Sequence, residues 1–147
     1  MKNSTLIALN DSVSSRKALD FMLKFSILPK DAHLTLLHVF RKPTAGEELM
    51  GEKFMKQLPV KFENFLEGVR DKLVENGFDP ERIEIKLVTD AYATTTEGII
   101  DQFHKGDYNM VVLGRKRMSK AEEFVLGDVG VKLVRALEGV AIMVVKA

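Results

Sequence analysis

The stretch MVVLGRKRMSKAEEFVLGDVG, residues 110–130, joins an apolar run to a charged segment that contains three glycines. A short apolar run bounded by turn residues is typical of a strand that is buried on both faces of a sheet. A glycine directly after such a strand lets the backbone approach a phosphate group closely. Four cations follow, namely Arg115, Lys116, Arg117 and Lys120. The stretch therefore predicts a buried strand that leads into a candidate anion-binding segment.

The alternation of short apolar runs with longer amphipathic runs extends over the whole chain. The apolar runs typical of strands are residues 5–9, 34–40, 83–88, 110–113 and 140–145. The amphipathic runs between them have apolar residues at helical spacing, including residues 62–73 and 122–137. Strands that alternate with helices predict a parallel sheet covered on both faces, which is a doubly wound α/β fold in a single domain.

Local signals place the helix boundaries. Ser12 or Ser14 can cap the first helix, and Pro29 is expected to stop it. Residues 94–97, Thr-Thr-Thr-Glu, form a capping box that opens a later helix. Residues 41–58 show no long periodicity, and we predict that they form a mobile connection or lid.

Composition excludes several classes of function. The chain has 147 residues, a formal net charge of +1 and no cysteine. A nearly neutral balance argues against a nucleic-acid partner, and without cysteine neither a disulfide nor a thiolate metal site can form. No apolar run approaches the roughly 18 residues that a membrane span needs, and the first residues lack the features of a secretory signal. We therefore expect a cytoplasmic protein without a membrane partner.

The histidines and serines do not predict a catalytic or metal site. His33, His38 and His104 have no ligand spacing, so we expect no bound metal and interpret His38 as a hydrogen-bonded core residue. The serines at residues 12, 14 and 15 are explained by turn and capping chemistry, and no nucleophile elbow occurs. The sequence therefore offers no catalytic residue.

The chain resembles the universal stress protein family over essentially its whole length. The resemblance rests on the opening strand with its Asn-Asp-Ser turn at residues 10–12, Leu-Leu-His-Val at residues 36–39, and Val-Val-Leu-Gly at residues 111–114. It also includes the closing run at residues 140–145. The resemblance implies an adenine-nucleotide α-hydrolase-like sheet with strand order 3-2-1-4-5. It also implies that the loops after the first and fourth strands face each other across a crevice.

The family's most specific motif is a glycine, two residues, a glycine, nine residues, and then glycine with serine or threonine. Gly114 matches the first position and Gly127 the third, whereas Arg117 replaces the second glycine and Asp128 the hydroxyl residue. The aspartate that family members use against adenine and ribose falls on Asn10. The resemblance implies a ligand-binding set of Ala8, Asn10, Asp11, Ser12, Val39, Leu113, Gly114, Arg115, Arg117, Gly127, Asp128, Val129 and Gly130.

The departures from the motif oppose triphosphate binding. A carboxylate at residue 128 cannot donate a hydrogen bond at neutral pH, and about 4 Å from a phosphate charge it costs roughly 4 kcal/mol at an effective dielectric near 20. A left-handed backbone at Arg117 costs on the order of 1–2 kcal/mol. We therefore predict that Arg117 and Asp128 form an ion pair where a triphosphate would lie, although Arg115 and its neighbours are equally explained as solvated loop charges.

The last apolar run predicts self-association. Val140, Ala141, Ile142, Met143, Val144 and Val145 form a strand that is apolar on both faces. Such a strand at a sheet edge invites pairing with another chain, and in the universal stress family it pairs with its twin in a two-fold dimer. We therefore expect a homodimer through this strand.

The resulting hypothesis is a universal-stress-type homodimer without an obligatory cofactor. It would act in a stress response or regulation through contacts with an unidentified protein partner, with weak or absent binding of ATP or AMP. One alternative is an ATP- or AMP-binding sensor with slow hydrolysis, in which Arg115 and Arg117 hold the phosphates. Another is a different adenine-binding α/β module, similar to the electron-transfer flavoproteins.

Overall fold

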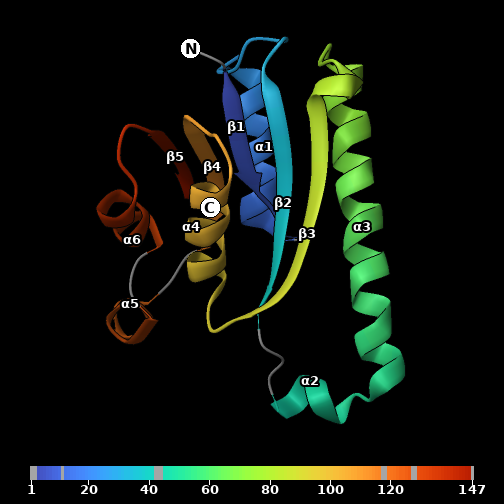
Figure 1. Ribbon diagram of the computed structural model, residues 1–147. Coiled ribbons are helices and arrows are strands. Elements are labelled where there is room, and N and C mark those ends of the chain that lie inside the picture. The colour runs from blue at the N-terminus through green and yellow to red at the C-terminus, as the bar shows by residue number, and fades with distance from the viewer. Residues whose placement is uncertain (1–2, 11, 42–44, 117–118, 127–128, 147) are drawn as a thin grey trace.

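A five-stranded parallel sheet forms the centre of the molecule (Figure 1). The computed structural model describes residues 3–10, 12–41, 45–116, 119–126 and 129–146. The strands are β1 (Ser4–Ala8), β2 (His33–Arg41), β3 (Ile83–Tyr92), β4 (Met110–Arg115) and β5 (Ala141–Lys146). Their spatial order is β3-β2-β1-β4-β5, which confirms the predicted doubly wound sheet. The order reverses between β1 and β4, where a parallel sheet opens a crevice at the carboxyl ends of its strands.

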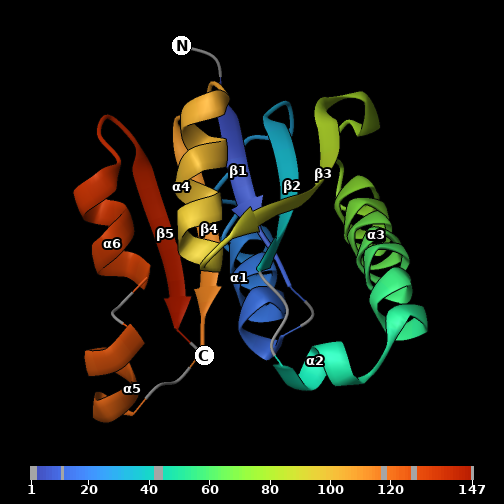
Figure 2. The same cartoon turned by 60° about the horizontal axis from the view of Figure 1, so that its bottom comes forward.

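Helices cover both faces of the sheet (Figure 2). They are α1 (Val13–Lys24), α2 (Ala45–Leu49), α3 (Glu52–Glu75), α4 (Thr95–Lys105), α5 (Lys120–Leu126) and α6 (Val129–Ala136). One apolar cluster packs α1 and α3 against the sheet through Met22, Leu66 and Leu73. A second cluster packs α4 and α6 against the opposite face through Ile99 and Leu133. The core is therefore two layers, divided by the sheet.

The segment at residues 41–58 differs from the prediction of an irregular connection. Residues 45–49 form α2, and α3 begins at Glu52 and continues through Pro59 to Glu75. Gly51 has φ +90° just before α3 and separates it from α2, whereas Pro59 does not end α3. Because Pro59 lies two turns from the start of α3, it removes one main-chain hydrogen bond from a part of the helix that is mostly exposed.

Other boundaries also differ from the sequence-based expectations. The first helix ends at Lys24, well before Pro29, and Ser26 follows with φ +48°. The predicted run at residues 122–137 is two helices, α5 and α6. The strands β1 and β5 are each shifted by one residue from the predicted runs, and β3 extends to Tyr92. The carboxyl-terminal extension of β3 brings Tyr92 against α4, which helps to position the site.

Candidate functional site

A pocket of about 380 Å³ lies at the carboxyl ends of β1, β2 and β4. Volumes of this size are typical of small-molecule sites, and the crevice at a change of strand order is where doubly wound sheets bind ligands. The predicted residues that line the pocket are Ala8, Asn10, Ser12, Val39, Leu113, Gly114, Arg115 and Val129. The structure therefore brings together most of the described residues that the sequence suggested.

The remaining predicted site residues do not line this pocket in the described part of the chain. Gly130 lies one residue into α6 and lines a shallow hollow on the β5 side. Asp11, Arg117, Gly127 and Asp128 lie outside the described residues. The predicted ion pair between Arg117 and Asp128 therefore stays a prediction.

The inner wall of the pocket is apolar. It is formed by the buried side chains of Ala8, Leu37, Val39, Ile99 and Leu113, which belong to the core cluster beneath α4 and α6. Because successive side chains of a strand alternate between its faces, residues two apart on β2 and β4 contribute to the same wall. This wall suits a flat apolar group such as an aromatic ring.

The turn between β1 and α1 is a closed hydrogen-bond network. Asn10 Oδ1 accepts hydrogen bonds from the main-chain N–H of Ser12 at 2.9 Å and from the hydroxyl of Ser15 at 3.0 Å. Ser12 is the N-cap of α1, and its hydroxyl oxygen accepts from the main-chain N–H of Ser15 at 3.2 Å. Ser14 and Ser15 are buried, and Ser14 shares a 2.9 Å hydrogen bond with Ser12. The serines are therefore committed to capping, as predicted.

Gly114 is required by the close approach of two backbones. A Cβ atom at this position would lie 2.1 Å from the main-chain oxygen of Ser14 and 2.7 Å from the main-chain nitrogen of Ser15. Gly114 belongs to β4, so the start of α1 rests directly on the end of that strand. The glycine therefore positions the wall of the pocket, whether or not its own N–H contacts a ligand.

His38 holds the end of β2 against β1. Its Nδ1–H donates a 2.8 Å hydrogen bond to the carbonyl oxygen of Leu9, and the side chain is buried. The imidazole stacks on the Phe62 ring at 3.8 Å between centroids and meets Phe40 edge-on at 4.6 Å. The prediction of a hydrogen-bonded core histidine is confirmed, and His38 also lines the pocket.

The start of α4 forms the rim opposite β1. Thr94 caps the helix and its hydroxyl oxygen accepts from the main-chain N–H of Glu97, as the capping box predicted. A Cβ atom at Gly98 would lie 2.4 Å from Cγ1 of Val39, so the helix packs tightly against the pocket wall. The N-terminal end of α4 carries a partial positive charge, which favours a bound anion nearby.

A polar network fixes the second half of α4 to the end of β3. The Tyr92 hydroxyl donates to Asp101, whose carboxylate also pairs with Lys105 at 2.9 Å. The hydrogen bond from Tyr92, followed by that from Lys105, lowers the pKa of Asp101 from its ordinary value. The same hydrogen bond to Asp101 is the main cause that raises the pKa of Tyr92. The network ties the second half of α4 to the last residue of β3.

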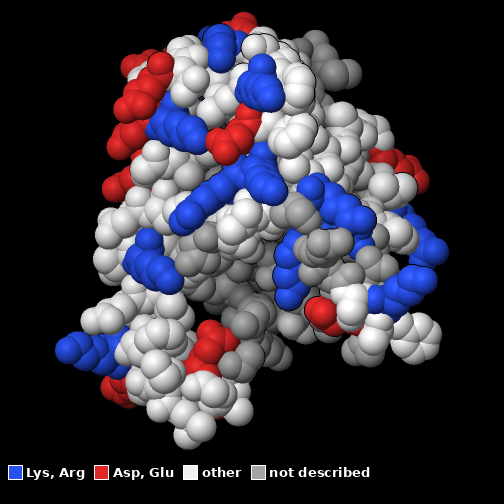
Figure 3. All heavy atoms as spheres, turned by 180° about the vertical axis from the view of Figure 1, so that it is seen from behind, with Lys and Arg blue, Asp and Glu red and all other residues white. Residues whose placement is uncertain are grey.

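Among the described residues, the charged side chains that line the pocket are cations. Arg115, Lys116 and Lys132 line it, and no Asp or Glu does so among the described residues. Figure 3 shows the face that carries α1 and α3, with Lys and Arg side chains above and beside a hollow in the lower half of the view and with Asp and Glu side chains also at its sides. Three cations that line the same pocket, together with the N-terminal end of α4, favour an anionic group in the ligand.

Several residues of the pocket were not predicted as ligand-binding residues. They are Leu9, Ser14, Ser15, Leu37, His38, Thr94, Thr95, Thr96, Ile99, Lys116 and Lys132. The sequence did identify the threonines as a capping box and Lys116 as part of a cationic cluster. A rule that helix starts after parallel strands face the crevice would have placed the threonines at the site. Lys132 gives no such signal, since its position depends on how α6 packs.

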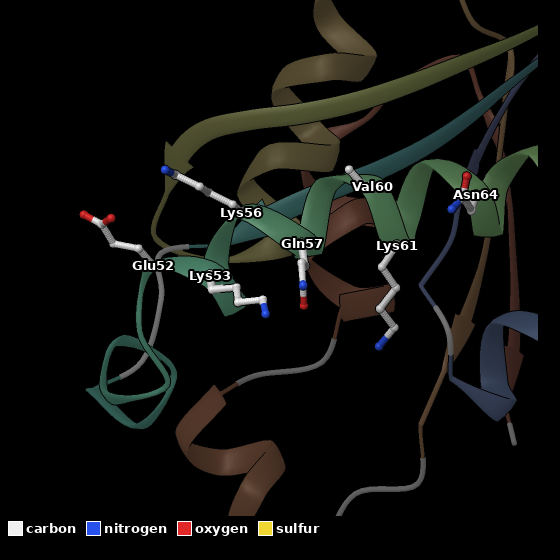
Figure 4. A pocket seen from close by; sticks show the side chains of 7 residues that line it. All are labelled: Glu52, Lys53, Lys56, Gln57, Val60, Lys61 and Asn64. Carbon is white, nitrogen blue, oxygen red and sulfur yellow. The ribbon is translucent and has the colours of Figure 1, made fainter.

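A second hollow, of about 620 Å³, lies along the first half of α3. Figure 4 shows its lining residues on successive turns, with Lys53, Gln57 and Lys61 pointing to the same side. All of the lining residues belong to this one helix, so the hollow has a single wall and cannot enclose a ligand. The pocket between β1 and β4 is the better candidate site.

The described residues form neither a metal site nor a membrane span. No group of three or more His, Asp or Glu side chains is placed to hold a metal ion there. No described helix is both long and apolar enough to cross a membrane.

Comparison with known proteins identifies the family. The model of the universal stress protein family matches residues 1–146. The chain belongs to the universal stress protein family. The family's fold agrees with the observed strand order and with helices on both faces, which confirms the resemblance seen in the motifs. Among curated protein sequences, none matches significantly.

Solved structures of universal stress proteins and related chains share this fold at low sequence identity. The hypothetical protein MJ0577 is 19% identical with a TM-score of 0.73, over 100% of this chain and 97% of that one. A universal stress protein in complex with cAMP is 14% identical with a TM-score of 0.68, over 99% and 97%. The universal stress protein UspA from Lactobacillus plantarum is 12% identical with a TM-score of 0.69, over 97% of each chain.

Proposed function

We propose that this universal stress protein is a regulatory binding module for a nucleotide with a short phosphate tail. The pocket between β1 and β4 would hold the base on its apolar wall and the phosphate beside its cations. A universal stress protein of the same fold has been solved in complex with cAMP, which supports a mononucleotide as the ligand class. A regulatory role through contacts with a protein partner is part of the same proposal.

The observation that carries the proposal is the separation of the pocket into an apolar wall and a cationic rim. Ile99 and Leu113 are buried in the wall, whereas Arg115, Lys116 and Lys132 line the pocket. A ligand that matches both parts needs a flat apolar group and an anionic group. A nucleoside monophosphate and a cyclic nucleotide both meet this requirement.

Binding rather than catalysis is supported by the assignments of the polar groups. Ser12 and Ser15 are engaged in the cap of α1, and the His38 Nδ1–H is donated to Leu9. A nucleophile needs a neighbouring general base within hydrogen-bond reach, and the described lining residues do not provide such a pair. The alternative of a slow ATPase that uses Arg115 and Arg117 stays a prediction, because residue 117 lies outside the described residues.

The length of the phosphate tail is the second part of the proposal. By the family motif, Asp128 occupies the position of a hydroxyl residue that contacts phosphate. A carboxylate there opposes a long polyanionic tail more than a single phosphate, since the repulsion grows with the number of nearby charges. We therefore expect AMP and cAMP to bind more tightly than ATP.

Thermal unfolding with AMP, cAMP, ADP and ATP tests the proposal. A ligand at 100 times its dissociation constant raises the free energy of unfolding by about 2.7 kcal/mol. The protein should be purified without nucleotide, and any molecule that stays bound should be identified by mass spectrometry. Binding of ATP as tight as that of AMP would contradict the short-tail assignment, and no effect of any nucleotide would contradict the proposed function.

A matched pair of variants locates the phosphate. Lys132→Ala removes a cation that lines the pocket, and we expect the AMP dissociation constant to rise roughly tenfold, as for the loss of a hydrogen bond to a charged group. Lys30→Ala is the control, because Lys30 lies over the Phe78 ring and does not line the pocket. Equal effects of both substitutions would place the phosphate elsewhere.

A further inference from the structure

We propose that Asn10 determines ligand specificity as a hydrogen-bond donor, and that the pocket prefers a 6-oxopurine nucleotide to an adenine nucleotide. This inference rests on the proposed function, since it names the base in the same pocket. It depends on the orientation of one side-chain amide, which the surrounding hydrogen bonds fix.

The oxygen of the Asn10 amide is identified by its partners. Oδ1 lies 2.9 Å from the main-chain nitrogen of Ser12, which carries a hydrogen and can only donate. The atom that receives this hydrogen bond must be the amide oxygen, so the assignment of oxygen and nitrogen does not depend on the appearance of the side chain. The hydroxyl of Ser15 donates to the same oxygen at 3.0 Å.

Ser15 makes the opposite orientation unfavourable. Its hydroxyl oxygen accepts a 3.0 Å hydrogen bond from the main-chain N–H of Asn10 and so keeps its own hydrogen for Oδ1. The Ser15 side chain is buried at the start of α1. Rotation of the amide would place its NH₂ group against the N–H of Ser12 and would break both bonds. The turn therefore holds Oδ1 of Asn10 toward the main-chain N–H of Ser12 and the hydroxyl of Ser15.

With Oδ1 engaged, the Nδ2 group is the part of Asn10 left for a ligand. Asn10 is exposed and lines the pocket, and among the described residues Nδ2 makes no hydrogen bond. An amide nitrogen has two N–H groups and no acceptor capacity. The ligand group that lies against Asn10 must therefore accept a hydrogen bond.

The position of Asn10 relates this requirement to the base. Asn10 lies two residues beyond Ala8, which belongs to the apolar wall. A planar ring on that wall would present one edge toward the end of β1. Asn10 in the observed orientation presents hydrogen-bond donors to that edge, whereas an aspartate in its place would present only acceptors.

Inosine monophosphate and AMP differ in the substituent at C6 of the purine ring. The first has an oxo group at C6, which accepts hydrogen bonds, whereas AMP has an amino group, which donates them. An amino group against the Nδ2 hydrogens leaves two donors facing each other. Sites built around one hydrogen-bond partner reject the mismatched analogue strongly, so we expect inosine monophosphate to bind at least about tenfold more tightly than AMP.

Isothermal titration of both nucleotides against the natural protein and its Asn10→Asp variant tests the inference. A carboxylate oxygen can accept from Ser12 and Ser15 as Oδ1 does, so the turn is expected to stay folded, and thermal unfolding checks this. The new charge weakens both nucleotides alike. The ratio of the two dissociation constants is therefore the measured quantity, and we expect the preference to reverse toward AMP. Asn64→Asp on α3 is the control, because Asn64 does not line this pocket.

Three outcomes separate this inference from the proposed function. A tenfold preference for inosine monophosphate that reverses in Asn10→Asp and persists in Asn64→Asp supports it. Equal affinities in the natural protein, or a ratio unchanged by Asn10→Asp, would overturn the role of Asn10 and leave nucleotide binding intact. Failure of both nucleotides to bind the natural protein would overturn the proposed function, and the inference with it.

Discussion

The backbone of Ser14 lies so close to Gly114 that a Cβ atom on the glycine would be 2.1 Å from the Ser14 carbonyl oxygen. The end of β4 and the start of α1 are therefore in direct main-chain contact. We expect Gly114→Ala to lower the free energy of unfolding by about 1–3 kcal/mol, as for other overpacked sites. It should also weaken nucleotide binding, because α1 must move away from the pocket. Urea unfolding and titration with AMP measure the two effects.

Gly68→Ala provides the matched control. Gly68 lies within α3, and a Cβ atom there would meet no atom within 4 Å beyond the helix itself. Alanine at an unhindered position inside a helix is expected to raise the free energy of unfolding by roughly 0.5–1 kcal/mol. Destabilisation of equal size at both glycines would mean that the contact with Ser14 is not the cause.

The network of Tyr92, Asp101 and Lys105 gives stability that depends on pH. The pKa of Asp101 is lowered by the hydrogen bond from Tyr92, so its contribution is present at neutral pH and is lost as the pH falls below about 4. The pKa of Tyr92 is raised by the same bond, so that contribution is present below about pH 10 and is lost above it. We expect Tyr92→Phe to destabilise the protein near neutral pH and to have a smaller effect at both extremes.

Measurements of unfolding by urea at pH 3, 7 and 11 test this expectation. Tyr108→Phe is the control, because the Tyr108 ring packs against Phe103 and its hydroxyl is outside the Asp101 network. A difference between the natural protein and Tyr92→Phe that stays constant over the pH range would show that the substitution acts through packing alone.

The alternation of strands and helices could be predicted because several independent signals agree. The apolar runs and the caps at Ser12 and Thr94 indicate the same series of elements. The strand order, and the expectation that Ala8, Val39 and Leu113 lie at one site, came from the resemblance to the universal stress protein family. The observed topology brings these three residues together at the carboxyl ends of β1, β2 and β4.

Features that depend on tertiary packing could not be predicted. Proline and glycine break most helices, yet α3 continues through Pro59 because its later residues Leu66, Val69 and Leu73 anchor it to the sheet. The placement of Lys132 at the pocket depends on the packing of α6. The role of Gly114 was expected to be room for a phosphate, whereas the structure gives it a main-chain neighbour on α1.

Restoring the family motif tests the sequence-based account of the phosphate tail. The double substitution Arg117→Gly and Asp128→Ser replaces both departures at once. If the carboxylate opposes the tail, ATP affinity should rise, by up to about three factors of ten before screening, since roughly 4 kcal/mol of repulsion is removed. AMP affinity should change much less. Calorimetric titration of both nucleotides measures the change, and an unchanged ATP affinity would contradict a role for these residues.

The edge strand β5 is the basis of the predicted homodimer. It pairs with β4 on one side and is the last strand in the sheet. Val144 is 36% exposed on β5, and charged residues on an edge strand oppose pairing with another chain. We expect the natural protein to sediment as a dimer and Val144→Lys to shift it toward monomer. Val60→Lys on α3 introduces the same charge at an exposed valine away from β5, so it should leave the dimer intact. A monomeric natural protein, or equal dissociation by both lysines, would rule out association through β5.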